Sequence, residues 1–175
     1  MSYLTPVKRP VGYSLTRHRL QKGFRKESLP KISRVPTSRA EELVMAFRFG
    51  LLQKDRSIAL WTEGLGYQPF HGRIALLMNE HTHSAAEMVA AFAKENALVR
   101  TIGVRTAGEV LGGANFRVGA GYRVRLPVAA WYPWSENVVE GRGIDPDHDA
   151  PLTFEDLLSR QDHQLQQAEK LLREM

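Results

Sequence analysis

The chain has 175 residues, of which 43% are hydrophobic and 25% are charged, so its composition is typical of an ordinary globular domain. It contains no cysteine, which excludes disulfides and thiolate metal sites and leaves the cellular compartment open. No stretch reaches the roughly 18 apolar residues of a membrane helix, and the first residues lack the apolar run of a signal peptide. We therefore expect no membrane span and, for the chain as written, a cytoplasmic location.

The net charge of +5 is concentrated near the start of the chain. Residues 1–36 contain nine Lys or Arg residues and one acid, Glu27. Because prolines also interrupt this region, we expect residues 1–38 to form a basic, irregular segment with one short extended piece at Val11–Leu15. Such a segment is suited to holding a partner chain or a second copy. A basic arm for nucleic acid is the alternative, but no nucleic-acid-binding motif is present, so we do not expect that partner.

Regular patterns begin at residue 39. Ser38 and Glu41 form a capping box before an apolar face, which predicts a helix over residues 39–52. The other predicted elements are strands at Ile58–Trp61, Arg73–Met78 and Leu98–Val104, a helix at Ala85–Asn96, a hairpin from Phe116 to Val128 around Gly119–Gly121, and one or two amphipathic helices in the tail. The order strand, turn, helix, strand predicts a parallel βαβ unit with a right-handed crossover.

Ser84 lies where a predicted buried strand turns into the helix at Ala85. The first turn of a helix has backbone N–H groups without internal partners and carries partial positive charge. Such N–H groups stabilise the oxyanion of a tetrahedral intermediate. One interpretation is therefore a nucleophilic serine with the Ala85 N–H as an oxyanion donor. The other is a structural cap, because Ser84 and Glu87 have the spacing of a capping box, and for Glu87 we expect capping rather than tuning of a site.

Three segments, in order along the chain, resemble motifs of the tail-specific (C-terminal-processing) serine peptidases. His71–Glu87 is similar to the nucleophile segment of that family, in which a glycine and an apolar strand precede Asn-Glu and Thr-x-Ser-Ala-x-Glu. Gly103–Gly108 is similar to its G-x-x-T-x-G turn, and Glu140–Asp147 to its E-G-x-G-[IV]-x-P-D signature. The resemblance covers roughly residues 70–150.

The resemblance implies an α/β fold, namely a partial ClpP/crotonase-like βαβ spiral with a C-terminal β-hairpin and amphipathic helices. It implies a serine-type peptidase that hydrolyses polypeptide substrates through an acyl-enzyme on Ser84, without cofactor or metal. The Ala85 backbone N–H is the implied oxyanion donor, and Glu140 is the candidate acidic member of the catalytic group. Residues 39–175 would be the C-terminal part of the peptidase core, with the N-terminal portion of the usual domain missing. Related peptidases are often exported.

The sequence departs from this family at the general base. Some of these peptidases have a lysine directly after the G-x-x-T-x-G turn, and Glu109 stands at that position here. In others, a His and a first Ser precede the core, in a region that this chain lacks. Lys94 should project away from Ser84, ten positions further along the helix. We therefore expect a truncated form with little or no activity alone, and the alternative is an inactive binding or assembly module derived from such a peptidase.

Three further groups of residues are expected to be structural. His81 and His83 lie in the turn before the serine, but no third ligand has a recognisable spacing, so we expect no metal there. The acidic segment 145–149 fits no EF-hand spacing and predicts a turn in which the aspartates bond to their own backbone. The aromatic cluster 131–134 is expected to pack the hairpin onto the core, with a substrate groove as the alternative.

Overall fold

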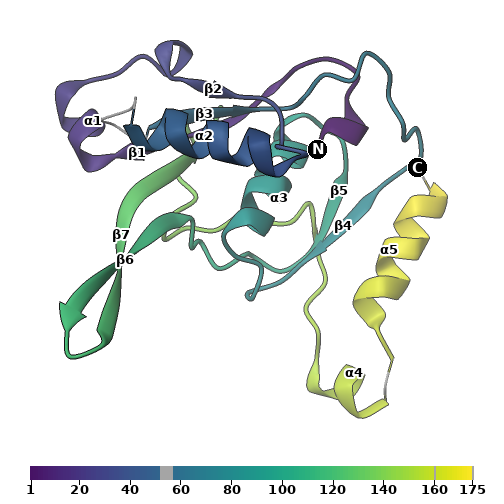
Figure 1. The fold of residues 1–175 in the computed structure, drawn as a ribbon. Helices are drawn as coiled ribbons and strands as arrows, with labels where there is room; N and C mark the ends of the chain where they lie inside the picture. Colours follow the sequence, from purple (N-terminus) through teal and green to yellow (C-terminus); the bar gives the residue numbers. More distant parts are fainter. Residues whose placement is uncertain (52–56, 160, 175) are drawn as a thin grey trace.

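The computed structural model describes residues 1–51, 57–159 and 161–174, which form an α/β fold (Figure 1). The strands are β1 (Pro10–Thr16), β2 (Lys31–Ile32), β3 (Ile58–Trp61), β4 (Ala75–Met78), β5 (Arg100–Gly103), β6 (Leu111–Gly119), β7 (Tyr122–Pro133) and β8 (His148–Asp149). The α-helices are α1 (Arg17–Lys22), α2 (Arg39–Leu51), α3 (Ala85–Glu95), α4 (Phe154–Ser159) and α5 (His163–Glu174), and 3-10 turns lie at η1 (Ser2–Leu4) and η2 (Lys26–Ser28). None of these described helices is long and apolar enough to cross a membrane.

The strands form two sheets with α3 packed between them. One sheet has the order β2-β3-β1-β7-β6, and the other has the order β4-β5-β8. β4 and β5 pair in parallel, with Ala75 beside Arg100 and Met78 beside Gly103, so the predicted βαβ unit is confirmed. Phe92 of α3 has no exposed surface and lies in one core cluster with residues of both sheets. α5 packs on β4 and β5, and α3 packs on β5. β4 is apolar along its whole length, as expected for a buried parallel strand.

Residues 1–38 are more regular than the sequence predicts. The expected extended piece lies within β1, which pairs antiparallel with β3 on one side and with β7 on the other. Val11, Tyr13 and Leu15 of β1 are 4%, 3% and 2% exposed. The extended piece predicted at Val11–Leu15 is therefore confirmed. The irregular structure expected for the rest of the segment is wrong for residues 17–22, which form α1. The division of the chain at residue 38 stays a prediction.

Part of the basic charge of this segment is used within the molecule. Lys26 Nζ lies 2.7 Å from Glu136 Oε1 and 5.0 Å from the ring centre of Trp134. Lys31 Nζ lies 4.8 Å from the ring centre of Trp61. Lys26 therefore binds the segment that follows β7, and Lys31 contacts β3.

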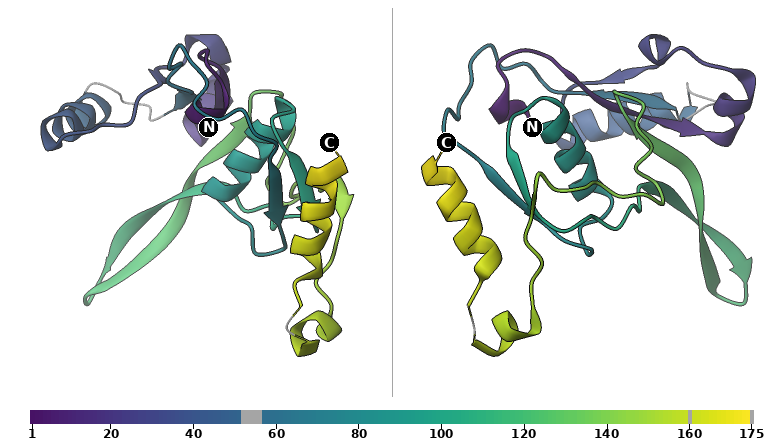
Figure 2. Two further views of the ribbon diagram at one scale, coloured as in Figure 1. Left: turned by 90° about the vertical axis from the view of Figure 1, so that its right-hand side faces the viewer. Right: turned by 180° about the vertical axis from the view of Figure 1, so that it is seen from behind.

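α2 confirms the helix predicted after the capping box, and residue 52 of that prediction lies outside the described residues. The Glu41 N–H donates to Ser38 Oγ at 3.3 Å, while Glu41 Oε2 accepts from the Thr37 N–H at 2.8 Å. The apolar face of α2 is not packed on the core: Leu43 and Val44 are 71% and 66% exposed. α2 lies to one side of the rest of the chain in the left view of Figure 2.

β6 and β7 form the predicted hairpin, which projects from the body as a two-stranded ribbon (Figures 1 and 2). Phe116 stands opposite Val124 on one face, and Arg117 stands opposite Arg123 on the other. The predicted packing role of the aromatic cluster is confirmed. Trp131 is 2% exposed in the core, and Tyr132 and Trp134 pack against a second cluster that contains Tyr13. The predicted helices of the tail are also confirmed, as α4 and α5.

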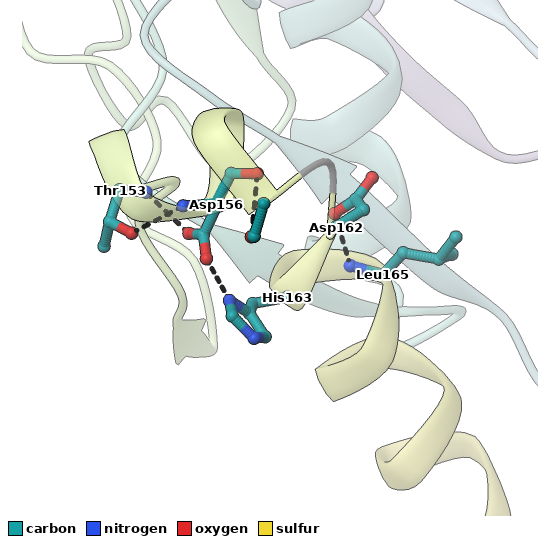
Figure 3. A network of polar contacts seen from close by, with 6 residues as sticks. Thr153, Asp156, Asp162, His163 and Leu165 are labelled. Carbon is teal, nitrogen blue, oxygen red and sulfur yellow. Dashed lines mark hydrogen bonds and ion pairs between the residues drawn. The ribbon is translucent and has the colours of Figure 1, made fainter.

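A polar network connects α4 with α5 (Figure 3). Asp156 Oδ2 accepts from the Thr153 N–H at 2.7 Å, and the Asp156 N–H donates to Thr153 Oγ1 at 3.2 Å, which makes a capping box. Asp156 Oδ1 contacts Nδ1 of His163, the first residue of α5. The hydrogen bond from the Thr153 N–H and the contact with His163 lower the pKa of Asp156. The Asp156 side chain, 3% exposed, therefore fixes the corner between the two helices.

We predict that Asp156→Asn lowers the melting temperature at neutral pH and that this difference from wild type shrinks in acid. A carboxyl with a lowered pKa in the folded state contributes stability above its ordinary pKa of about 3.9 and loses it as the pH falls through the folded value. Thermal melts of both proteins at pH 7 and in steps below pH 4 measure the difference. An equal difference at every pH would contradict this role for the carboxylate.

Candidate active site

Ser84 occupies a turn position that normally requires glycine. It connects the segment after β4 with the start of α3, and its backbone angles are φ 56° and ψ −124°. The Ala86 N–H donates to the His83 carbonyl oxygen at 3.2 Å. These angles and this bond define a type II′ turn with Ser84 at the first central position. For a residue other than glycine, such backbone angles cost about 1–3 kcal/mol of conformational strain, and strain of this kind is concentrated at functional sites.

The Ser84 side chain is exposed and does not cap the helix. It accepts no capping hydrogen bond from the first turn of α3. A capping residue normally has extended backbone angles, and the positive φ of Ser84 differs from them. The interpretation of Ser84 and Glu87 as a capping box is therefore wrong. The hydroxyl is accessible from solvent, as a nucleophile must be.

The Ala85 N–H is the free amide next to the Ser84 hydroxyl. Ala85 is exposed and is the first residue of α3, so its N–H has no partner inside the helix. Within the described residues, no atom accepts a hydrogen bond from it. The neighbouring Ala86 is also exposed and small. The start of α3 therefore presents an unpaired donor to any carbonyl that approaches Ser84.

Glu87 is buried and binds the second motif instead of capping α3. It has no exposed surface. Its Oε1 accepts from Thr106 Oγ1 at 2.5 Å and from the Gly108 N–H at 2.7 Å, and its Oε2 accepts from the Glu109 N–H at 2.9 Å. The expected capping role of Glu87 is wrong, because the carboxylate serves a distant loop rather than the first turn of its own helix. The Glu109 carbonyl oxygen in turn accepts from the Ser84 N–H at 2.9 Å.

The third motif closes on the second. The Ile144 N–H donates to Thr106 Oγ1 at 2.8 Å, and the Gly141 N–H donates to the Gly108 carbonyl oxygen at 2.8 Å. Gly143 has φ +72°, and a Cβ atom there would lie 2.2 Å from the Thr106 carbonyl oxygen. The glycine of the third motif is therefore required both by its conformation and by this close approach. The three segments that the sequence singles out are in contact.

Glu140 contacts this region through its side chain, whereas Glu109 contacts it through its backbone. Glu140 Oε2 accepts from the Val110 N–H at 2.7 Å, so its carboxylate holds the segment that follows the second motif. Glu109 contacts Ser84 through its backbone carbonyl, and its own side chain is exposed. Among the described residues, no side chain hydrogen-bonds the Ser84 hydroxyl. The structure thus gives Glu140 a supporting contact, and its catalytic role stays a prediction.

Lys94 is engaged at the other end of α3. Its Nζ lies 3.0 Å from Asp147 Oδ1 and donates to the Asp145 carbonyl oxygen at 2.5 Å. Asp147 Oδ2 also accepts from the Thr101 N–H at 3.0 Å and from Thr101 Oγ1 at 2.9 Å. Partial burial raises the pKa of Asp147, but the hydrogen bonds from Thr101 and Lys94 outweigh it and lower the pKa overall.

These contacts correct the expectation for the acidic segment 145–149. Asp147 binds β5 and α3, and Asp145 Oδ1 accepts from Arg105 Nε at 2.6 Å. These two aspartates therefore bond to other segments rather than to their own turn. β5 places Thr101 beside the segment, because β8 pairs with β5 in parallel.

The described residues contain no group of three or more His, Cys, Asp or Glu side chains that could hold a metal ion. His81 and His83 are exposed, and the closest acid to the His81 ring is Glu80, at 3.9 Å. Several clefts lie elsewhere. One of about 470 Å³ lies between residues 30–36 and α2. Another, of about 210 Å³, is a mostly apolar groove between α1, the end of β1, Leu111 and the last part of β7.

The sequence indicates Ser84 as a candidate at the start of a helix, but it does not reveal the hydrogen bonds around it. The spacing of Ser84 and Glu87 fits a capping box, so the sequence provides no sign that the Glu87 carboxylate is buried. The signal that could have revealed it was the pairing of Glu87 with a Thr and a Gly in a second motif. A satisfied buried carboxylate needs donors of that kind.

Comparison with known proteins agrees with these motifs. The sequence profile of peptidase family S41 matches residues 18–150. Among proteins with curated descriptions, none matches the sequence.

Solved structures share the fold. A protein of Parabacteroides merdae has a TM-score of 0.65 and 17% identity, over 98% of this chain and 45% of its own. Mature CPAF in complex with lactacystin has a TM-score of 0.58 and 15% identity, over 98% of this chain and 40% of its own. The tricorn protease has a TM-score of 0.53 and 27% identity, over 63% of this chain and 11% of its own. The chain thus spans less than half of each of these proteins. Since the S41 profile covers most of its residues, the chain belongs to peptidase family S41.

Proposed function

We propose that the chain carries the nucleophile of a serine peptidase and that Ser84 is that nucleophile. The observation that supports this most is the type II′ turn with an exposed serine at a glycine position, directly before a helix. A strained turn between strand and helix is a known way to present a nucleophilic serine. The S41 match and the contact between the three motifs support the same proposal.

The proposed reaction is acyl transfer from a polypeptide substrate to the Ser84 oxygen. The oxygen attacks the carbonyl carbon while a base takes its proton, and the Ala85 N–H stabilises the oxyanion. The C–N bond then breaks, the leaving amine takes the proton, and water hydrolyses the ester. We propose Glu140 as a supporting acid of the site, because it holds the segment next to Glu109.

The base is the missing part of this proposal. Glu109 stands where related peptidases have lysine, and Lys94 is bound to Asp147 and Asp145. No described side chain hydrogen-bonds the Ser84 hydroxyl. We therefore propose that the 175-residue chain alone has weak activity and that full activity needs a base from another polypeptide segment.

A second candidate function is an inactive binding or assembly module. Exposed apolar side chains on α2 and on the β6–β7 hairpin favour it, because such surfaces mark interaction sites. The basic segment 1–38 is the other candidate surface for a partner chain. The module would keep the fold of the peptidase and lack its chemistry.

We predict that a fluorophosphonate probe labels the wild-type chain slowly and does not label Ser84→Ala. Labelling requires only a reactive serine and an oxyanion donor, so it does not depend on a substrate. Intact-mass spectrometry of both proteins, with melting curves as the folding control, measures the adduct. Equal labelling of the two would refute Ser84 as the nucleophile. No labelling of a folded wild type would favour the binding module.

We predict that Glu109→Lys raises the labelling rate of Ser84 by at least about tenfold, since a general base typically contributes 10²–10⁴-fold. Glu109→Gln is the matched control, because it removes the carboxylate without adding an amine. The rate is measured from about pH 7 to 10, where a lysine base should give a rise with pH. Faster labelling of both variants would assign the gain to loss of the acid, and slower labelling of Glu109→Gln would make Glu109 itself the base.

A further inference from the structure

We infer that Glu87 is a positioning residue that holds Ser84 in its strained turn. The inference rests on the proposed function of Ser84. Glu87 lies three residues after Ser84, on α3, and it has no exposed surface. Since it is sealed from solvent, a substrate does not reach it. Any effect of Glu87 on Ser84 must therefore act through the groups that its carboxylate binds.

Those groups lead back to Ser84 in two steps. The Glu87 carboxylate accepts from the Gly108 N–H at 2.7 Å and from the Glu109 N–H at 2.9 Å, which fixes the peptide between them. The Glu109 carbonyl accepts from the Ser84 N–H at 2.9 Å. A parallel contact joins the Ala107 N–H to the Thr82 carbonyl oxygen at 3.0 Å. The 107–109 segment is thus bonded to Thr82, Ser84 and Glu87.

These hydrogen bonds between the Ser84 turn, Glu87 and residues 107–109 oppose the relaxation of the turn. A serine at φ 56° would move to a negative φ if its neighbours allowed it. Such a change reorients the Ser84 peptide relative to α3, so it breaks either the bond to Glu109 or the turn bond between Ala86 and His83. The Glu109 carbonyl resists because Glu87 holds the amide of the same residue. Thr106 holds Glu87 from the other side and is anchored in turn by the Ile144 N–H.

The chemistry of the contacts requires a carboxylate. Backbone N–H groups face both oxygens, Gly108 at Oε1 and Glu109 at Oε2. In Glu87→Gln, one position becomes an NH₂ group, so either orientation of the amide sets a donor against a donor. No described residue forms an ion pair with Glu87. Its negative charge is stabilised by these donors and by the start of α3, where the helix dipole is positive.

The strain of Ser84 gives a test that needs no activity. Glycine at position 84 accepts φ 56° freely and alanine does not, so Ser84→Gly should melt about 2–4 °C above Ser84→Ala. In a Glu87→Gln background the turn relaxes, and this glycine advantage should disappear. In an Asp156→Asn background it should persist. Asp156→Asn is the matched control, because it changes another buried, hydrogen-bonded carboxylate far along the chain.

The labelling rate is the second readout. Displacement of a reacting atom by about 1 Å costs on the order of a hundredfold, so Glu87→Gln should label with a fluorophosphonate about a hundredfold more slowly than wild type. Asp156→Asn, which also lowers stability, should label at the wild-type rate. Equal slowing in both variants would reduce Glu87 to a general stabilising residue and overturn the inference.

The two readouts separate this inference from the proposed function. If no protein is labelled, the proposed function fails, while the glycine advantage still decides whether Glu87 holds the turn. If the advantage is equal in all backgrounds, or absent in the wild-type background, the positioning role is wrong even when Ser84 is labelled. If Glu87→Gln does not fold, Thr106→Val replaces it. That variant removes one of the three donors and should cause a smaller loss of the glycine advantage.

Discussion

A carboxylate without solvent contact is stable in a protein only when hydrogen bonds replace its lost hydration, because removal of a charge from water costs several kcal/mol. Glu87 meets this condition with three donors, all from the segment 106–109. β4 and β5 have only four residues each, so strand pairing alone does little to determine the path of the loops beyond them. The Glu87 carboxylate fixes the path of the loop after β5 through its hydrogen bonds to residues 106–109. Through Thr106 it also connects the loop to the third motif at Ile144.

The elements that the sequence predicts best are those with a clear local pattern. β3, β4, α3, β5 and the β6–β7 hairpin follow from apolar runs, alternation and glycine-containing turns, each of which is a local pattern. β1 was underestimated, because its burial depends on strands that are far away in the sequence, β3 and β7. The reverse holds for α2, whose amphipathic pattern is clear while its apolar face is exposed. The pattern of apolar residues indicates which face of a segment could be buried. Whether that face is buried depends on the tertiary structure.

The site was less predictable than the fold for a different reason. A residue type does not determine its backbone angles, so the φ of 56° at Ser84 could not be predicted from the sequence. The role of Glu87 was hidden because the same spacing serves a capping box. Position 109 illustrates the separation of scaffold and chemistry: its backbone keeps the contact with Ser84, and its side chain is not the lysine of related peptidases. A fold can persist while one reactive group changes.

The β6–β7 hairpin has a consequence for how the protein behaves in solution. β6 is an edge strand of nine residues, and its outer edge has no strand partner in the described part of the chain. Such an edge is a template for fibril-like pairing between molecules. Arg117 and Arg123, opposite each other near the tip, repel the same pair on an approaching molecule. This repulsion weakens as added salt shortens the Debye length to about 8 Å at physiological ionic strength. The protein should therefore be best stored dilute, at low ionic strength.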